Sequence, residues 1–206
     1  MAGNIAVVGI DEVGRGAFAG PLVAAAVVLG SAEIALSSGQ RGQKAANSSS
    51  YQECPVIRDS KKMTQRQRML ADRWIRANCI FSVGMATVEE INCFGIVEAN
   101  QLAFTRSLEI FSPKSCYLYS DAYAVVSWPK DSQQAIVHGE DAHPCIAAAS
   151  IIAKEYRDTY MRVIAPIFPK FGWEKNVGYG TKIHRGALKI YGPTIHHRSL
   201  FIKNWV

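Results

Sequence analysis

The sequence lacks the cysteine patterns of disulfide-rich and zinc-binding proteins. Its five cysteines are odd in number and scattered, and none forms a C-x-x-C pair (Cys54, Cys79, Cys93, Cys116 and Cys145). Such a set predicts reduced thiols in a cytosolic protein rather than a disulfide framework or a structural zinc site. No internal repeat is visible either.

The chain also lacks a long apolar run. The longest stretches, Pro21 to Leu29 and Cys145 to Ala153, fall well short of the roughly 20 residues that a membrane-spanning helix needs. The first ten residues have no basic flank and no cleavage-like site, so a secretory signal is not expected. The expectation is a soluble cytoplasmic protein with no membrane partner.

Acidic residues are fewer than basic ones. The 206-residue chain has 17 Asp and Glu against 23 Lys and Arg, which gives a formal net charge of +6. This excess favours a polyanionic partner, and nucleic acid is the first candidate. The length is sufficient for one domain with a full hydrophobic core, with room for a small C-terminal appendage.

Apolar and β-branched residues predict two strands near the start of the chain. Ile5 to Ile10 is expected to form a buried strand that ends at Asp11. A glycine-rich turn leads into a second strand over Pro21 to Leu29, and so short a connection predicts an antiparallel hairpin. Gly30 to Glu53 is rich in Ser, Gly, Gln and Asn and is expected to be a mobile loop or an insertion.

The rest of the chain alternates between helical and strand patterns. Thr64 with Gln67, and Thr87 with Glu90, have the spacing of a capping box, which predicts a helix start at each place. The other expected elements are strands at Cys79–Ala86 and Cys116–Ser120 and helices at Ile96–Phe111, Pro144–Ile164 and Lys182–Tyr191. Irregular alternation after an opening hairpin predicts an α/β fold with a mixed sheet.

Carboxylates lie where the apolar segments stop. Asp11 and Glu12 follow the first expected strand, Asp121 follows a later one, and Glu140 and Asp141 precede the long helix. Adjacent strand residues point to opposite faces, so Asp11 and Glu12 can share a site only if the following turn is distorted. The neighbouring glycines permit such a distortion.

Carboxylates gathered at one edge of a sheet would repel one another unless a cation lay between them. Their hard oxygens suit Mg²⁺ or Mn²⁺, and two such ions about 4 Å apart can activate water and stabilise the leaving oxygen of a phosphodiester. Each acid taken alone is equally consistent with a turn former or a helix cap. The residues by themselves therefore predict a metal-binding α/β domain and leave its reaction open.

Five motifs follow one another along the chain. They are Ile10–Gly16 with Gly20–Val23, Asp59–Lys62, Ser120–Asp121, Ile146–Lys154 with Arg157–Asp158, and Gly178–Thr181 with His184 and His197–Phe201. In sequence and order they resemble the motifs of ribonuclease HII, the type 2 ribonuclease H. The resemblance covers most of the chain apart from Gly30 to Glu53.

The resemblance implies a ribonuclease H-like α/β fold, in which helices flank a mixed sheet and a small helical C-terminal region follows. It assigns residues 1–165 to the catalytic domain and residues 166–206 to a region that completes the substrate groove. The implied enzyme cuts the RNA strand of RNA·DNA hybrids and cuts 5′ of single ribonucleotides in duplex DNA, leaving 3′-hydroxyl and 5′-phosphate ends. A monomer that serves DNA replication and ribonucleotide excision repair is implied as well.

The resemblance also assigns metal ligands for Mg²⁺ or Mn²⁺, namely Asp11, Glu12 and Asp121. The family places its fourth catalytic carboxylate, usually Asp, six residues before the position of Ile146, where this chain has Glu140. Asp141 lies one residue closer and is the alternative. Glu140 is slightly favoured.

Ribose and phosphate contacts are implied next. A 2′-hydroxyl distinguishes RNA from DNA, and a glycine backbone can approach a sugar closely. By resemblance the G-R-G turn contacts the ribose and a tyrosine stacks near the next sugar, while basic side chains contact phosphates. The expected substrate-binding residues are Gly14, Arg15, Gly16, Lys61, Lys62 and Tyr179.

Two other functions stay open. A basic, non-catalytic nucleic-acid-binding module would use the same acids as caps and turn residues, and a junction-resolving nuclease of the same fold class would cut branched DNA. His184, His196 and His197 lack a partner at zinc-ligand spacing and are predicted to be structural or to contact phosphate.

Overall fold

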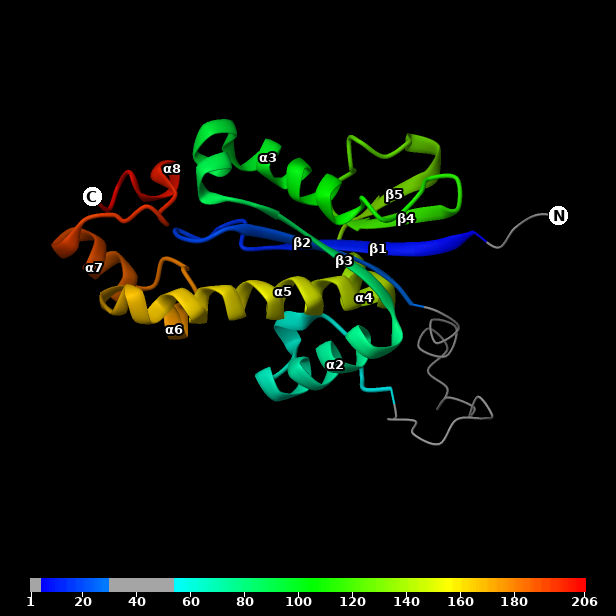
Figure 1. The fold of residues 1–206 in the computed structure, drawn as a ribbon, viewed down its shortest axis with the longest axis horizontal. Helices are drawn as coiled ribbons and strands as arrows, with labels where there is room; N and C mark the ends of the chain where they lie inside the picture. The colour runs from blue at the N-terminus through cyan, green and yellow to red at the C-terminus, as the bar shows by residue number, and fades with distance from the viewer. Residues whose placement is uncertain (1–4, 30–53) are drawn as a thin grey trace.

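The computed structural model describes residues 5–29 and 54–206. Its core is one five-stranded sheet in the order β3-β2-β1-β4-β5, with helices on both faces (Figure 1). The predicted loop or insertion at Gly30 to Glu53 lies outside the described residues. Within the described part, no helix combines the length and apolar character that a membrane crossing requires.

The opening hairpin is confirmed. β1 (Ala6–Val13) and β2 (Leu22–Val28) pair in antiparallel fashion, and β3 (Ile80–Ala86) pairs antiparallel with β2 at the edge of the sheet. All residues of β2 up to its last are buried. Its short, alanine-rich side chains suit a central strand that is covered on both faces.

The predicted end of the first strand at Asp11 is wrong. Asp11 pairs with Ala25 and Glu12 pairs with Ala24, so the ladder continues through both acids. The backbone of an antiparallel pair bonds without regard to side-chain charge, and the alanines opposite leave room for both carboxylates. The prediction placed the end of the strand too early because it relied only on the polarity of Asp11 and Glu12.

The second half of the sheet is parallel. β4 (Cys116–Asp121) pairs with β1, and β5 (Gln133–Ile136) pairs with β4. The strand at β4 was predicted, but β5 was not. Its sequence Gln-Gln-Ala-Ile is short and half polar, which is too weak a pattern to distinguish an edge strand from a turn.

Helices cover the two faces of the sheet with separate cores. α3 (Val88–Ser107) packs on one face, where Phe104 and Ile10 belong to the same buried cluster. α5 (Pro144–Ile164) packs on the other face, with α2 (Gln65–Asn78) outside it (Figure 1). The alanine run of α5 lets this helix lie close to β1. The predicted bounds of α5 are confirmed.

Both predicted capping boxes are present. Thr64 and Thr87 each accept a hydrogen bond from the backbone of the third helical residue, whose side chain bonds back. The helix start predicted at Thr87 is therefore confirmed, and the periodic stretch from Ile96 is the later part of α3. The predicted end at Phe111 is wrong, because the last helical residue of α3 is Ser107. Gly95 interrupts it with a φ of 81°, which explains why the helical periodicity restarts there.

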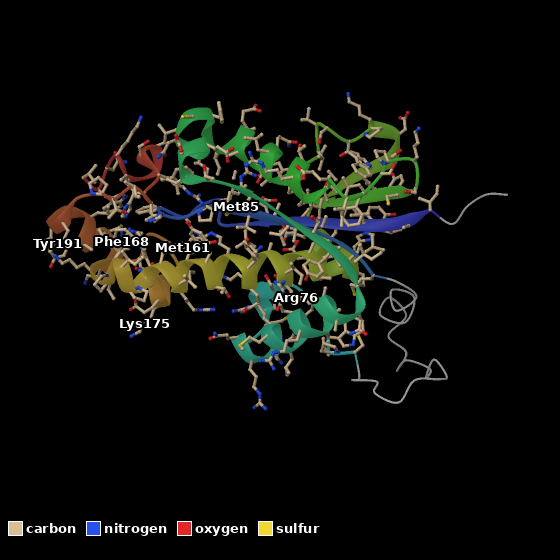
Figure 2. The ribbon with its side chains drawn as sticks, in the orientation of Figure 1. Arg76, Met85, Met161, Phe168, Lys175 and Tyr191 are labelled. Carbon is tan, nitrogen blue, oxygen red and sulfur yellow. The ribbon has the colours of Figure 1, made fainter. Side chains whose placement is uncertain are left out.

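The C-terminal elements pack at the far end of α5 as a third cluster. Figure 2 shows Met161 and Phe168 at this end, where they contact this cluster. The shorter elements within residues 5–29 and 54–206 are η1 (Ser60–Lys62), η2 (Lys130–Ser132), α4 (Gly139–Ala142), η3 (Ala165–Ile167), η4 (Pro169–Phe171), α6 (Trp173–Asn176), α7 (Lys182–Tyr191) and α8 (Ser199–Ile202). The helix predicted at α7 is confirmed. The division at residue 165 stays a prediction.

Candidate active site

Parallel pairing brings two of the predicted acids to adjacent strands. The register of β1 and β4 runs to Ile10 opposite Ser120, so the next residues are Asp11 and Asp121. Neighbouring strands lie about 4.8 Å apart and their paired residues face the same side. Asp11 is buried and accepts a hydrogen bond of 2.7 Å from the backbone amide of Glu12.

Glu12 reaches the same region without leaving the strand. Its side chain is 10% exposed and lies 3.8 Å from the guanidinium of Arg15. Asp121 and Lys61 both act on the ionisation of its carboxyl group, so the three are neighbours. The distorted turn that the sequence seemed to require is therefore not what brings Glu12 to the site.

Asp121 and Glu140 meet at the start of α4. Asp121 accepts a 3.0 Å hydrogen bond from the Gly139 amide and interacts with the Glu140 carboxyl through a side-chain hydrogen bond. Lys61 approaches from η1, with its Nζ 3.4 Å from Glu140 Oε1. Elements from three distant parts of the sequence thus supply one acidic cluster.

The two candidates for the fourth carboxylate have different environments. The Glu140 side chain is 6% exposed and belongs to the acidic cluster, whereas that of Asp141 is 52% exposed. Asp141 pairs instead with the Lys62 ammonium group. The geometry therefore favours Glu140 for this role.

The ionisation of the cluster reflects its burial. Burial, followed by the charges of Glu12 and Asp121, raises the pKa of Asp11 well above its usual value. Burial likewise raises the pKa of Glu12 to about 7, although Arg15 opposes this. Burial and repulsion from Glu140 raise the pKa of Asp121, even though the Gly139 amide lowers it. The Arg15 guanidinium and the Lys61 ammonium group therefore offset only part of the mutual repulsion of these carboxyl groups.

The carboxylate oxygens of the acidic cluster suit a hard divalent cation, both as oxygen ligands and because they carry negative charge. One oxygen each of Glu12 and Glu140, Oε2 in both, is buried without a hydrogen-bond partner in the described part of the chain. Carboxylate oxygens of this type are what Mg²⁺ and Mn²⁺ prefer. Among residues 5–29 and 54–206, however, no three His, Cys, Asp or Glu side chains are already arranged around one metal position. The side chains of the acidic cluster would therefore have to rotate to share an ion.

The G-R-G turn lies directly beyond the acids. Gly14 has a φ of 96°, a conformation that L side chains rarely adopt. The Arg15 guanidinium stacks over the Tyr123 ring at 4.0 Å from its centroid, and Gly16 is exposed. Tyr179 is half-buried at the edge of the C-terminal cluster. The amides of Phe18 and Ala19, which follow the turn, donate hydrogen bonds to the Gly178 carbonyl. Tyr179 therefore lies in the same region as the G-R-G turn.

The two predicted phosphate-binding lysines belong to η1. Asp59 caps this short helix by accepting a 2.9 Å hydrogen bond from the Lys61 amide. Lys61 then faces Glu140, whereas Lys62 faces Asp141. Both ammonium groups border the acids, where they could also meet a phosphate.

The C-terminal histidines support the structural interpretation. His184 and His197 are 0% and 4% exposed, and their Nε2 atoms lie 3.0 Å apart. Trp173 donates to His184 Nε2 at 3.3 Å. His196 is only half-buried, against Phe168 and Trp173.

The sequence did not reveal several residues that hold the site. Ser150 of α5 donates to Asp11 and bonds to the Ser60 hydroxyl at 2.9 Å. Arg157 and Arg198 are fully buried and bond to carbonyl oxygens around the G-R-G turn. The only signal in the sequence for any of these residues was Ser150, a polar residue within an alanine-rich helix, and nothing in the sequence indicated that it contacts Asp11 and Ser60.

Comparison with known proteins agrees with this geometry. The family profile described as Ribonuclease HII matches residues 8–39 and 50–204. The chain is 42% identical to the ribonuclease HII of Sphingopyxis alaskensis over 195 residues, which span 95% of this chain and 88% of that protein. It is 40% identical to the ribonuclease HII of Thermosynechococcus vestitus, over 96% of this chain and 84% of that protein.

The fold is similar to those of solved ribonucleases. The ribonuclease HII in the PCNA complex from Archaeoglobus fulgidus superposes with a TM-score of 0.72 at 25% identity, covering 94% of each chain. Ribonuclease H2 from Pyrococcus horikoshii OT3 gives 0.67 at 22% identity over 94% and 92% of the two chains, which shows the shared fold. The chain belongs to the ribonuclease HII family and is a ribonuclease H endonuclease.

Proposed function

We propose that this enzyme hydrolyses the RNA strand of RNA·DNA hybrids and cuts on the 5′ side of single ribonucleotides embedded in duplex DNA. The products would carry 3′-hydroxyl and 5′-phosphate ends. The observation that carries the proposal is the meeting of Asp11, Glu12, Asp121 and Glu140 beside the G-R-G turn. The carboxylates that suit phosphodiester hydrolysis thus lie next to the turn that can contact a ribose.

Divalent Mg²⁺ or Mn²⁺ would be held by Asp11, Glu12 and Asp121, with Glu140 as the fourth carboxylate. Two bound ions supply an activated water and stabilise the charge on the leaving oxygen. A solved ribonuclease HIII of the same fold is in complex with Mn²⁺. The buried and unpartnered oxygens of Glu12 and Glu140 support this assignment.

The remaining site residues bind and orient the substrate. The backbone of Gly14, Arg15 and Gly16 contacts the ribose 2′-hydroxyl, which can both donate and accept a hydrogen bond. Tyr179 stacks near the next sugar. Lys61 and Lys62, which border the acids, contact phosphates together with Arg15 and fix the register of the strand.

The decisive substrate is a DNA duplex with one embedded ribonucleotide. We expect a single cut at its 5′ side, complete loss of cutting with chelator, and recovery with Mg²⁺ or Mn²⁺. A junction-resolving nuclease would ignore this duplex and cut a four-way junction instead. Cutting that continues in chelator would refute the two-metal mechanism.

Asp11→Asn separates catalysis from binding. We expect the variant to lose cleavage while its affinity for an RNA·DNA hybrid stays within about threefold of wild type, because phosphate contacts dominate affinity. The affinity is measured by fluorescence anisotropy at fixed salt. Unchanged cleavage by a folded Asp11→Asn variant would refute the assigned role.

We also propose that the enzyme acts as a monomer in the cytoplasm, in DNA replication and ribonucleotide excision repair. Its excess of positive charge and absence of long apolar runs in the sequence support this setting. Light scattering at micromolar concentration tests the monomer, and a dimeric mass would contradict it.

A further inference from the structure

Two buried guanidinium groups lie behind the G-R-G turn. Arg157 of α5 and Arg198, just before α8, are both 0% exposed. Within the described residues, neither donates a hydrogen bond to a carboxylate, and both bond to backbone carbonyl oxygens. Burying a charged group that forms no ion pair is costly, even though the nearby charge of Asp158 favours the charged form of Arg157, so this arrangement needs an explanation beyond packing.

Arg157 joins the segment after the turn to the segment before Tyr179. Its three nitrogens donate to Pro21 O at 2.9 Å, Ala19 O at 2.9 Å and Val177 O at 2.8 Å. Its guanidinium lies 5.3 Å from the centroid of the Tyr179 ring. One side chain thus fixes the spacing between both predicted ribose-contacting elements.

Arg198 holds the turn itself. It donates to Gly14 O at 2.6 Å, to Arg15 O at 3.1 Å and to Gly20 O at 2.9 Å. A trans peptide is planar, with its N–H directed opposite to its C=O. Drawing the Gly14 and Arg15 carbonyls inward therefore directs the amides of Arg15 and Gly16 outward.

These two amides are unused. In the described part of the chain, neither the Arg15 nor the Gly16 amide donates a hydrogen bond, whereas that of Ala17 bonds to Gly14 O at 3.2 Å. Gly16 is exposed, and a Cβ built there would meet no atom within 4 Å. The turn therefore presents two donors to open space.

The geometry requires arginine at both places. A guanidinium has five donors in a rigid plane, whereas an ammonium has three on a flexible stem. Burial, followed by the nearby charge of Arg157, lowers the pKa of Arg198 to about 9. Arg198 therefore stays charged at neutral pH, so it holds its carbonyl partners by charge-assisted bonds.

We propose that Arg157 and Arg198 are positioning residues that set the selectivity of this enzyme for ribose. They hold the Gly14–Pro21 segment so that the Arg15 and Gly16 amides and the Tyr179 ring are fixed before substrate arrives. Fixed donors recognise a 2′-hydroxyl without an ordering cost, whereas the phosphate contacts of Lys61 and Lys62, which lie on η1, do not depend on the turn. The inference rests on the proposed ribose recognition and deepens it.

Arg198→Lys tests the inference through binding selectivity. The affinities for an RNA·DNA hybrid and for a DNA duplex of the same sequence are measured in chelator, so that neither is cut. We expect the preference for the hybrid to fall about tenfold, because charge-assisted hydrogen bonds to the turn are lost. Affinity for DNA should stay within about twofold, because Lys61 and Lys62 on η1 still contact the phosphates.

Arg157→Lys should have the same effect, and Arg162→Lys is the matched control. Arg162 is on α5 too, but it pairs with Asp158 at 3.7 Å and does not touch the turn. Its replacement should leave the preference unchanged. A parallel fall in both affinities, or an unchanged preference in folded Arg198→Lys, would overturn the inference.

Asn92→Ala covers the case in which the arginine variants do not fold. Asn92 is half-buried on α3 and supports the Arg198 segment from outside, through His197 O at 3.3 Å and the Ser199 amide at 2.8 Å. We expect about a threefold loss of preference; no loss in this variant would overturn the inference. A wild-type enzyme with no preference for the hybrid would instead refute the proposed ribose recognition itself.

Discussion

At the scale of single residues, environment distinguishes acids that the sequence leaves equivalent. Glu140 and Asp141 are adjacent, yet one carboxyl group is buried against Asp121 and the other is exposed beside Lys62. Consecutive residues in the first turn of a helix point about 100° apart, so only one of them can face a given site. A helix start is thus compatible with a buried acid of the cluster as well as with an exposed one.

The pair Glu140→Gln and Asp141→Asn measures this difference. We expect Glu140→Gln to lower the cleavage rate by about a hundredfold or more, because a neutral amide supports the bound cations poorly. Asp141→Asn should stay within about threefold, as expected for an exposed ion pair. Rates on the embedded-ribonucleotide duplex at saturating Mg²⁺ give the comparison. The opposite order would move the fourth carboxylate to Asp141.

The residue scale is also where prediction from sequence failed most often. Asp11 and Glu12 lie together in the acidic cluster, as the sequence suggested, but the position of Glu12 within a regular strand was not predicted. Ser150 was missed because its partners, Asp11 and Ser60, are remote in sequence and are brought to it only by the packing of α5 and η1. Local pattern cannot encode such a contact.

Ser150→Ala should weaken metal binding rather than abolish catalysis. Loss of the hydroxyl frees the Asp11 carboxylate to rotate, and outer contacts of this kind typically alter metal affinity about 10- to 100-fold. The Mn²⁺ concentration for half-maximal cleavage should rise accordingly, while the rate at saturating Mn²⁺ changes less. Ser107→Ala is the control, since Ser107 is also buried in a helix, but among the described residues its hydroxyl bonds to Phe104 O alone. An equal shift in both variants would count against a specific role.

At the scale of elements, close packing of α5 on β1 carries the acids into place. A Cβ built on Gly9 would lie 2.2 Å from the Cys145 carbonyl carbon and 2.4 Å from the Ile146 nitrogen. Both are backbone atoms, so they cannot move aside as a flexible side chain can. The start of α5, and α4 just before it, therefore depend on glycine at this position.

Gly9→Ala should destabilise the fold and lower activity together. We expect a loss of about 1–3 kcal/mol in the free energy of unfolding, the usual cost of overpacking. Gly186→Ala, in α7, has no atom within 4 Å of the added Cβ and should be neutral or stabilising by about 0.5–1 kcal/mol. Urea denaturation of the three proteins gives the comparison. A Gly9→Ala variant as stable as wild type would contradict the packing argument.

Elements with strong local signals were predicted well, and weak ones were not. Both capping boxes and the bounds of α5 and α7 follow from residues within each element. By contrast, β5 is an edge strand of four residues whose pairing with β4 is decided by tertiary structure. In α3 the capping box located the helix start at Thr87, but the helical periodicity began only after the kink at Gly95, because a kinked helix has no single local pattern.

At the scale of the whole molecule, the C-terminal segment closes back on the first turn of the chain. Ala19 forms a β-bridge with His197, and Arg198 bonds to Gly14, more than 180 positions away in sequence. Such closure has no signature in composition or periodicity. It could be inferred only from the resemblance, which assigned the C-terminal region to the substrate groove without saying how it attaches.

Closure of the C-terminal segment should make stability depend on pH. Burial, followed by the neighbouring His184, lowers the pKa of His197 to about 4. An unfolded histidine titrates near 6.5, so between these values the unfolded state binds more protons and stability rises with pH. The contribution is complete above about pH 6.5 and is lost as the pH falls toward 4, by about 3 kcal/mol at most.

Urea denaturation at pH 7 and pH 4.5 tests this, with His197→Gln as the comparison because it cannot take up a proton. Carboxyl groups also titrate at the lower pH, but they affect both proteins alike and cancel in the difference. Wild type should therefore lose more stability than the variant between the two pH values, although the variant is less stable at pH 7. His184 and His196 face the same cluster and remain in both proteins. Equal losses would mean that His197 takes up a proton without disturbing the contacts that hold the C-terminal segment to the turn.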